Sequence, residues 1–260
     1  MMDVWKPQKI DLDRCFQVQI GPLRLWIKRA GDELLMAVEN LPEPKAQIQA
    51  PILAPVDQEE GLRWSRWIIG ESEVIQLIPV MPDRPVVVRP EVPVKIPTDK
   101  EALFFVSIPI WVRVTAGSEQ AILCEQPSLI LSNIWFGDLM SGELCYSLRS
   151  RARRRITDSE PLLNRATCPV QIRNAAPTHL DVQRFCLHVE RLKIYAGQKQ
   201  LWTNQIRITF KGDEKAGRVD YSEGPPTFEP VGQMLSEARA PLKQTLLKKS
   251  LGGFGLLTAI

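Results

Sequence analysis

The sequence has little of what catalytic and metal sites usually require. It contains two histidines, His179 and His188, which lie nine positions apart without a partner at metal-ligand spacing. It also lacks a GxSxG nucleophile motif, a Walker phosphate loop and the glycine pattern of dinucleotide-binding proteins. The glycine-rich residues 251–255 follow an expected helix instead of opening one, which is the wrong context for holding a phosphate. We therefore expect structural histidines, and no catalytic residue, cofactor or metal ligand.

Cysteine pairs and long apolar runs are missing as well. The cysteines are odd in number, widely spaced and without a CxxC pair, which argues against a disulfide framework and a zinc ribbon. We expect them to be reduced residues of the core: Cys15, Cys124, Cys145, Cys168 and Cys186. No stretch reaches the roughly 18 apolar residues of a membrane-spanning helix, and the N-terminus lacks the apolar core of a secretory signal. These absences predict a cytoplasmic protein, which can still be peripheral to the membrane.

Charge and aromatic content argue against a nucleic-acid partner. The net charge of +3 is too small to indicate a polyanion partner by itself, and no RNP-like aromatic and basic motif is present. The tryptophans fall in strand patterns, where core packing is expected instead of base stacking: Trp26, Trp64, Trp67, Trp111, Trp135 and Trp202.

Prolines are abundant and dominate one block, residues 79–97, which leads into the apolar run 103–112. Proline fixes φ and removes a backbone donor, so this block cannot be helical, while its valines favour a pleated surface. Because proline does not fit centrally in a ladder, we expect an edge strand or a polyproline-like connector that crosses between two β domains.

Short alternating segments predict an all-β fold. Residues 16–20 and 23–28 alternate apolar and polar side chains around a Gly-Pro turn, and similar segments recur up to about residue 222. Regularly spaced short strands favour one or two antiparallel β-sandwich domains of jelly-roll or immunoglobulin-like type. We expect an N-terminal antiparallel β domain at 10–98 and a C-terminal β-sandwich domain at 99–225.

The C-terminal residues 226–260 show a different period. Apolar residues at spacings of three and four predict an amphipathic helix, with Lys243, Lys248 and Lys249 elsewhere on its surface. The apolar tail that follows, which includes Phe254 and Leu257, is too short to span a bilayer. It can pack back on the protein, meet a partner or lie on an anionic membrane surface.

Five arginines occur within residues 149–155. If the chain stays extended there, Arg149, Arg151, Arg153 and Arg155 share one face at period two, able to grip phosphates or carboxylates. The alternative is a solvated edge strand whose charge prevents aggregation.

Four segments resemble a known family: residues 82–91, 105–112, 135–146, and the hairpin from 189–195 to 201–203. They are similar to a prokaryotic family of unknown function, numbered four-thirty-two, over most of residues 10–215. The resemblance carries no assigned activity and no functional residue. It implies an accessory role beside membrane proteins, mechanosensitive channels among them.

Two functional hypotheses follow. The first is a non-enzymatic cytoplasmic β-sandwich protein that acts as a protein-interaction or membrane-protein accessory module, through the C-terminal helix and the arginines. The alternative is a carbohydrate-active or other hydrolytic β-sandwich enzyme whose paired carboxylates meet only in the fold. Its candidate pairs are Asp138 with Glu143 and Glu59 with Glu60, but Asp138, Glu59 and Glu60 are more simply turn residues.

Overall fold

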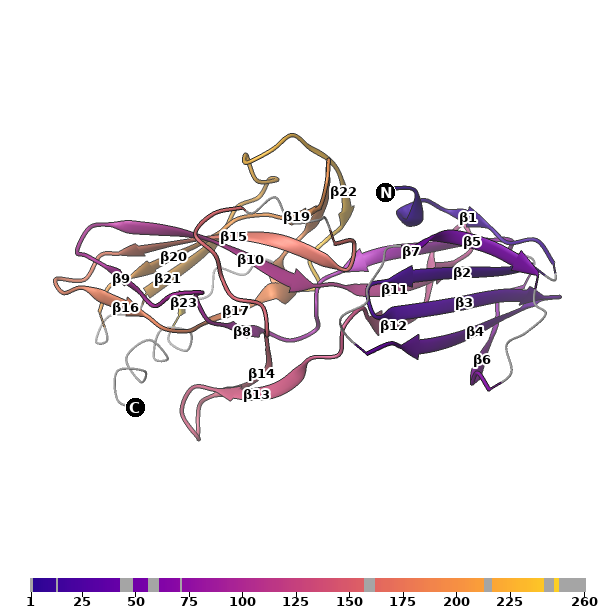
Figure 1. Cartoon of the computed structure of the whole chain (residues 1–260), viewed down its shortest axis with the longest axis horizontal. Helices are drawn as coiled ribbons and strands as arrows, with labels where there is room; N and C mark the ends of the chain where they lie inside the picture. Colours follow the sequence, from indigo (N-terminus) through magenta and orange to yellow (C-terminus); the bar gives the residue numbers. More distant parts are fainter. Residues whose placement is uncertain are drawn as a thin grey trace. The chain divides into compact units, whose positions relative to one another are not determined.

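The computed structural model describes residues 2–12, 14–42, 49–55, 61–70, 72–156, 162–212, 217–240 and 246–247. Nearly all of its regular structure is β-strand, as the alternating segments predict (Figure 1). The helices of the described residues are two short 3-10 turns, η1 (Met2–Trp5) and η2 (Val189–Arg191). Within the same residues, no helix has the length and apolar character needed to cross a membrane.

The chain forms two compact units, each assembled from separate segments. Unit 1 contains 1–80, 109–130 and 161–164, and unit 2 contains 81–108, 131–160 and 165–260. The division at residue 98 expected from the sequence takes each domain as continuous, whereas the chain returns to unit 1 twice. The second return is fixed by the Asn164 carbonyl, which accepts hydrogen bonds of 3.0 Å from the Ile110 N–H and the Ser128 hydroxyl.

Unit 1 consists of two antiparallel sheets. The first has the order β5 (Gln49–Pro55), β2 (Arg14–Ile20), β3 (Leu23–Ala30), β4 (Glu33–Asn40) and β6 (Trp64–Ile68). The second has the order β1 (Gln8–Lys9), β7 (Val74–Val80), β11 (Trp111–Ala116) and β12 (Ala121–Pro127). Tight turns join β2 to β3 and β3 to β4, where Gly21 and Gly31 adopt φ of 61° and 65° that favour glycine.

Unit 2 contains three sheets. The largest has the order β22 (Val231–Ser236), β18 (Ile194–Gly197), β19 (Leu201–Thr203), β15 (Arg165–Asn174), β20 (Ile206–Phe210), β21 (Gly217–Tyr221) and β23 (Leu246–Leu247), with β10 (Glu101–Pro109) paired to β15. A second sheet has the order β13 (Ser132–Phe136), β14 (Glu143–Ser147), β8 (Val86–Val88) and β17 (Phe185–Leu187). The third pairs β16 (Leu180–Val182) with β9 (Val94–Ile96).

Unit 2 departs from the purely antiparallel arrangement expected for it. Strand β14 pairs with β8 in parallel, and β15 pairs in parallel with both β19 and β20. Parallel neighbours need long crossover connections. The strands involved are far apart in sequence, so alternation within each strand carried no information about their relative direction.

The proline block was expected to form an edge strand or a connector, and for β8 this is wrong. Val86–Val88 is an interior strand with β14 on one side and β17 on the other. Pro85 and Pro90 flank these three valines, whose N–H groups remain able to donate to neighbours. Proline therefore limits the length of this strand and does not exclude it from the centre of a sheet.

The helix expected over 226–260 is not present in the described part of that range. Residues 231–236 form β22, which pairs antiparallel with β18, and residues 246–247 form β23. Spacing at threes and fours predicted a helix, but the free edge of β18 supplies backbone hydrogen bonds that favour a strand. Residues 241–245 and 248–260 lie outside the described residues, and with them Lys243, Lys248, Lys249, Phe254 and Leu257.

The core of unit 2 gives a direct test of this packing. Phe104 and Phe185 are fully buried, with ring centroids 5.9 Å apart. Phe104→Ala should lower the free energy of unfolding by about 3–5 kcal/mol, because it removes a large side chain and leaves a cavity. Val92→Ala is the control, since Val92 is 67% exposed and its truncation should change stability by less than about 0.5 kcal/mol. Urea denaturation measures both, and equal losses would contradict this assignment of the core.

Candidate functional site

Two short strands of unit 2 place chemically active side chains on one sheet. Because neighbouring residues of a strand alternate between faces, Glu143 and Cys145 of β14 share a face. Cys186 lies on β17, and His188 follows two positions later, between the end of that strand and η2. Strand β14 therefore presents two functional groups on one face, and β17 presents one, with His188 directly after it.

Strand β8 brings these groups together. It lies between β14 and β17, with Val87 opposite Ser147 on one side and opposite Cys186 on the other. Val87 also packs with both cysteines and with Phe136 in one small buried cluster. Residues more than 40 positions apart in sequence thus meet across a single central strand.

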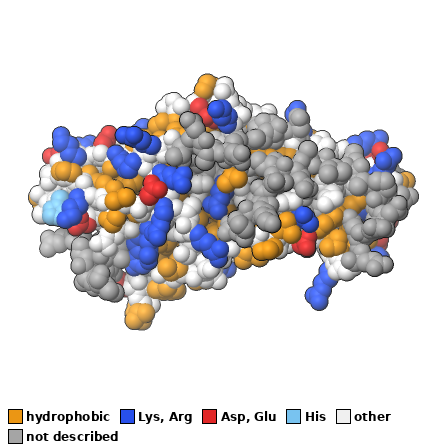
Figure 2. Space-filling view, viewed as in Figure 1, with side chains coloured by type: hydrophobic (Ala, Val, Ile, Leu, Met, Phe, Trp, Pro, Cys, Tyr) orange, Lys and Arg blue, Asp and Glu red, His pale blue; other side chains and the backbone are white. Residues whose placement is uncertain are grey.

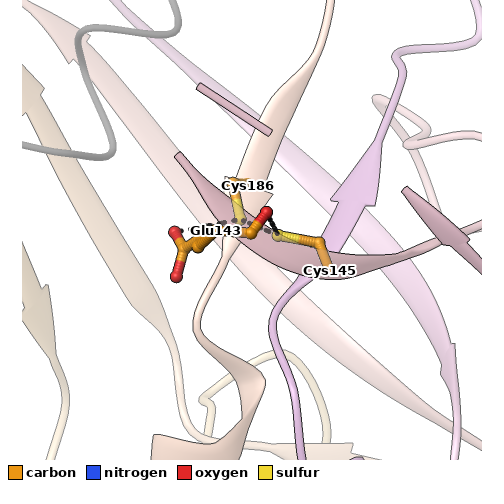
Figure 3. A group of neighbouring side chains, drawn as sticks. All are labelled: Glu143, Cys145 and Cys186. Atoms are coloured by element: carbon orange, nitrogen blue, oxygen red, sulfur yellow. Dashed lines mark hydrogen bonds between the residues drawn. The ribbon is translucent and has the colours of Figure 1, made fainter. Parts of the chain in front are cut away.

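The two cysteine sulfurs are in direct contact (Figure 3). Their Sγ atoms are 3.6 Å apart, and the residues are 0% and 5% exposed for Cys145 and Cys186, respectively. The Glu143 carboxylate reaches the same point, with Oε1 4.0 Å from the Cys186 sulfur. One ligand atom from each of the three residues lies within 4.8 Å of the others, so they could hold a metal ion.

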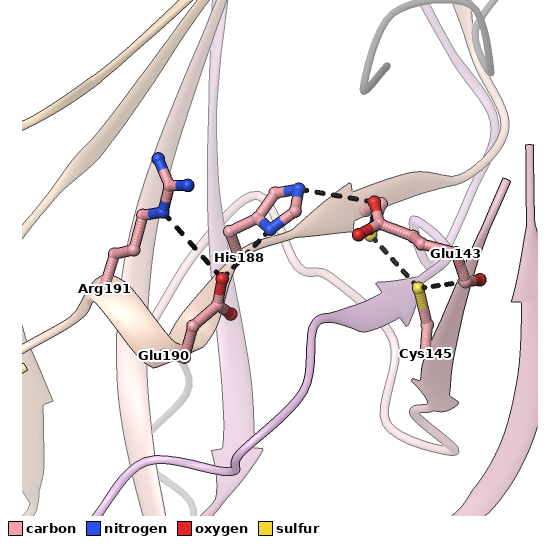
Figure 4. Close-up of polar contacts among 6 residues, drawn as sticks. Glu143, Cys145, His188, Glu190 and Arg191 are labelled. Atoms are coloured by element: carbon pink, nitrogen blue, oxygen red, sulfur yellow. Dashed lines mark hydrogen bonds and ion pairs between the residues drawn. The ribbon is translucent and has the colours of Figure 1, made fainter. Parts of the chain in front are cut away.

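His188 bridges two carboxylates beside these sulfurs (Figure 4). Its Nε2 lies 3.3 Å from Oε1 of Glu143, and its Nδ1 lies 3.0 Å from Oε1 of Glu190. Both partners are acceptors, so the ring donates from both nitrogens only when it is protonated. Arg191 lies beyond Glu190, with its Nε 3.9 Å from the same oxygen. A continuous chain of polar contacts therefore runs from Arg191 to the cysteines.

The electrostatics agree with a charged imidazole. Burial is the largest single influence and lowers the pKa of His188, but hydrogen bonds and charge from Glu143 and Glu190 together raise that pKa to about 9. The hydrogen bond with Cys145, followed by burial, raises the pKa of the Cys186 thiol well above its ordinary value of 9.0. The protein alone therefore favours an imidazolium beside a neutral Cys186 thiol.

The arginines at 149, 151, 153 and 155 are all exposed, as is Arg154, while Leu148 before them and Ala152 among them are buried. The backbone of Ala152 bonds to Arg89 and Glu91, and that of Arg153 bonds to Phe105 of β10. The segment is thus hydrogen-bonded on both sides at this point, which a free sheet edge is not. We call Arg149, Arg151, Arg153 and Arg155 the arginine row.

The hairpin of β13 and β14 carries an apolar tip that the sequence reasoning did not select. Leu139 and Met140 in its turn are 91% and 96% exposed. The turn is well defined, because the Asp138 carbonyl accepts hydrogen bonds from Trp135 Nε1 at 3.0 Å and from the Gly142 N–H at 2.7 Å. Asp138 also accepts a bond from the Ser141 hydroxyl, so it acts as the turn former that the sequence indicated.

The carboxylates that the hydrolase hypothesis considered have different places in the structure. Asp138 serves the turn, and residues 56–60, which include Glu59 and Glu60, lie outside the described residues. Glu143 instead meets Glu190, but the imidazole of His188 lies between them and hydrogen-bonds to both. In a glycosidase the space between the two carboxyl groups holds the scissile bond. Between Glu143 and Glu190, that space is occupied by the ring of His188.

The sequence did not predict that the cysteines and His188 form a cluster, because they belong to separate segments of the chain. Glu143-Leu-Cys145 and Cys186-Leu-His188 are both spaced for one face of a strand, and that spacing was the available signal. Their meeting depends on β8, whose pairing is non-local. The burial predicted for the cysteines is confirmed for four of them: Cys15, Cys145, Cys168 and Cys186. Cys124 is only half-buried.

Replacing His188 tests the bridge between the carboxylates. His188→Ala should lower the free energy of unfolding by about 2–3 kcal/mol, because the hydrogen bonds of the ring with Glu143 and Glu190 are lost. The other histidine supplies the control. His179 is exposed and lies 3.8 Å from Asp181, so His179→Ala should change stability by less than about 0.5 kcal/mol. Similar values for the two variants in chemical denaturation would exclude a structural role for the bridge.

Comparison with known proteins gives one match. The family model described as "Protein of unknown function (DUF432)" matches residues 4–254. No curated protein matches the chain. No solved structure matches it either. Since the match covers nearly the whole sequence, the chain belongs to this family of unknown function, the one that its strand and turn segments resemble.

Proposed function

We propose that this protein is a non-enzymatic accessory protein that attaches peripherally to an anionic membrane surface through unit 2. The observation that carries the proposal is the near-complete exposure of Leu139 and Met140 at the hairpin turn. We also infer a β-sandwich for unit 1, because Cys124 of one sheet contacts Met36 of the other at 3.7 Å. A cytoplasmic location is supported by the five free cysteines, which suit a reducing compartment.

The hairpin has the form of a membrane-inserting element. Its turn projects from the other strands of unit 2, and hydrophobic side chains cover the projecting end (Figures 1 and 2). Water around large apolar side chains is unfavourable, so two of them on a projecting turn favour transfer into a bilayer. A protein partner would instead need a matching pocket for this tip.

The face of the hairpin that does not contact the cysteines adds to this surface. Trp135 and Leu144 are paired across β13 and β14 and are 46% and 43% exposed. Tryptophan is enriched at the boundary between headgroups and acyl chains, and Trp135 offers its apolar ring there while its Nε1–H donates to the Asp138 carbonyl. The hairpin therefore offers an apolar tip followed by an interfacial side chain.

The arginine row continues from the same strand. It begins two residues after the end of β14, and Arg89, also exposed, lies one position before the bridge that pairs Pro90 with Ala152. Figure 2 shows Lys and Arg side chains gathered on the visible face of unit 2. Basic side chains near an anionic leaflet each contribute about 1 kcal/mol of attraction. The exposed apolar residues of the hairpin and the arginine row thus lie on one continuous segment of the chain.

The apolar tip is tested with vesicles that contain phosphatidylserine. Leu139→Ser with Met140→Ser should weaken co-sedimentation roughly 150-fold or more, because each side chain contributes about 1.5 kcal/mol or more on burial. Val92→Ser is the matched control, since Val92 is an exposed apolar residue of the same unit. No binding by the natural protein, or equal binding by the tip variant, would contradict membrane attachment and leave a protein partner as the alternative.

The contribution of the arginine row to membrane binding is tested by neutral substitutions. Arg151→Gln with Arg155→Gln should reduce binding to anionic vesicles about 30-fold, since two contributions of about 1 kcal/mol are lost. High salt should reduce binding by the natural protein as well, because it shortens the screening length from about 10 Å at 0.1 M to about 3 Å at 1 M. Lys199→Gln with Lys211→Gln removes the same charge from exposed positions elsewhere in unit 2. An equal loss in this control would show that net charge, and not the arginine row, attracts the membrane.

A further inference from the structure

We propose that Glu143, Cys145 and Cys186 form a binding site for a thiophilic divalent cation of the zinc class. This inference is independent of membrane attachment, since it rests on the opposite face of the hairpin. Thiolates are the ligands that zinc and other soft ions prefer, and a carboxylate completes many zinc sites.

The separation of the sulfurs fits a shared ion. Two sulfur ligands of a tetrahedral zinc ion, each about 2.3 Å from the metal, lie about 3.8 Å from one another. The observed distance between the sulfurs of Cys145 and Cys186 is 3.6 Å. With a carboxylate oxygen of Glu143 4.0 Å from one sulfur, three donors surround one point and a water molecule can supply the fourth.

The residues around the donors support this assignment. Ligands of protein-bound zinc are usually held by further hydrogen bonds that fix their orientation. His188 does this for Glu143 at 3.3 Å and is itself held by Glu190 at 3.0 Å. His188 is therefore a positioning residue for the carboxylate. Val87 and Phe136 belong to the same small buried cluster as the two cysteines and surround them with apolar side chains.

A disulfide is the main alternative use of two neighbouring cysteines. Its two sulfurs would have to be about 2.05 Å apart, whereas those of Cys145 and Cys186 are 3.6 Å apart and both cysteines are free. A shared ion keeps the sulfurs near this separation, because each sulfur then bonds to the metal and not to the other sulfur.

Binding of the cation releases protons from the site. Each cysteine binds as a thiolate, so two thiol protons leave as the cation enters, and Glu143 binds as a carboxylate. Glu143 connects the site to solvent, since its side chain is 27% exposed. Two thiolates and one carboxylate more than neutralise a divalent charge at this depth.

Cobalt is the probe for the experiment. The full chain is treated with a chelator under a non-thiol reductant and then titrated with Co²⁺. We expect one Co²⁺ per chain, sulfur-to-cobalt charge-transfer absorption in the near ultraviolet, and displacement of cobalt by an equivalent of Zn²⁺. Cys145→Ser and Cys186→Ser should each abolish this absorption.

Two further variants separate binding from folding. His188→Gln should weaken cobalt binding roughly 10- to 100-fold while the charge-transfer bands remain, as expected for a residue that orients a ligand. Cys168→Ser is the control, because Cys168 is equally buried but lies on β15, and it should bind cobalt like the natural protein.

Cobalt binding by the natural protein tests the proposal without any variant. The proposal can therefore be contradicted even if the variants do not fold. Absence of stoichiometric cobalt, or cobalt bound without sulfur absorption, would contradict the site. A Cys145–Cys186 disulfide found by peptide mapping of anaerobically purified protein would contradict it as well.

Discussion

The organisation of the hairpin sheet in unit 2 depends on the burial of one three-residue strand, β8. Its valines, Val86, Val87 and Val88, are 0–4% exposed and lie between two prolines that limit the strand to this length. A strand so short and apolar is stable only when partners cover both of its edges and both of its faces. Strand β14 covers one edge in parallel and β17 covers the other in antiparallel orientation. The positions of the cysteine cluster and of the arginine row both follow from this pairing.

The alternation of the hairpin then divides its residues between two roles. On one face, Ile134 and Cys145 are paired across β13 and β14 and pack toward Val87. On the other face, Trp135 and Leu144 are paired and exposed. The same pairing that buries the proposed cation site therefore presents the proposed membrane surface. The packed face of the hairpin also holds the exposed face in one conformation. Less conformational entropy is then lost when the exposed face binds a membrane.

The sequence predicted features that depend on neighbouring residues, such as the strands, but not the pairing of strands that are distant in sequence. Alternation predicted the strands, but β14 ends at Ser147 and the chain bends at residues 149–150 and 154–155, so the arginines at 149–155 do not continue it as one extended strand. The helix expected beyond residue 226 failed where β22 pairs with β18, since an available sheet edge outweighs a weak local preference. The central place of β8 and the contact of Cys145 with Cys186 depend on which strands pair. No property of those residues alone specifies that choice.

Amide hydrogen exchange tests the central place of β8 most directly. The Tyr146 N–H donates to the Pro85 carbonyl at 2.8 Å and the Leu148 N–H donates to the Val87 carbonyl at 2.9 Å. These two amides, with those of β8 bonded to β17, should be among the slowest to exchange in unit 2, because they open only when its core opens. Exchange of Tyr146 and Leu148 as fast as that of Leu139 and Met140 in the exposed turn would show that β14 is not held by β8. The basis for both proposed sites would then be lost.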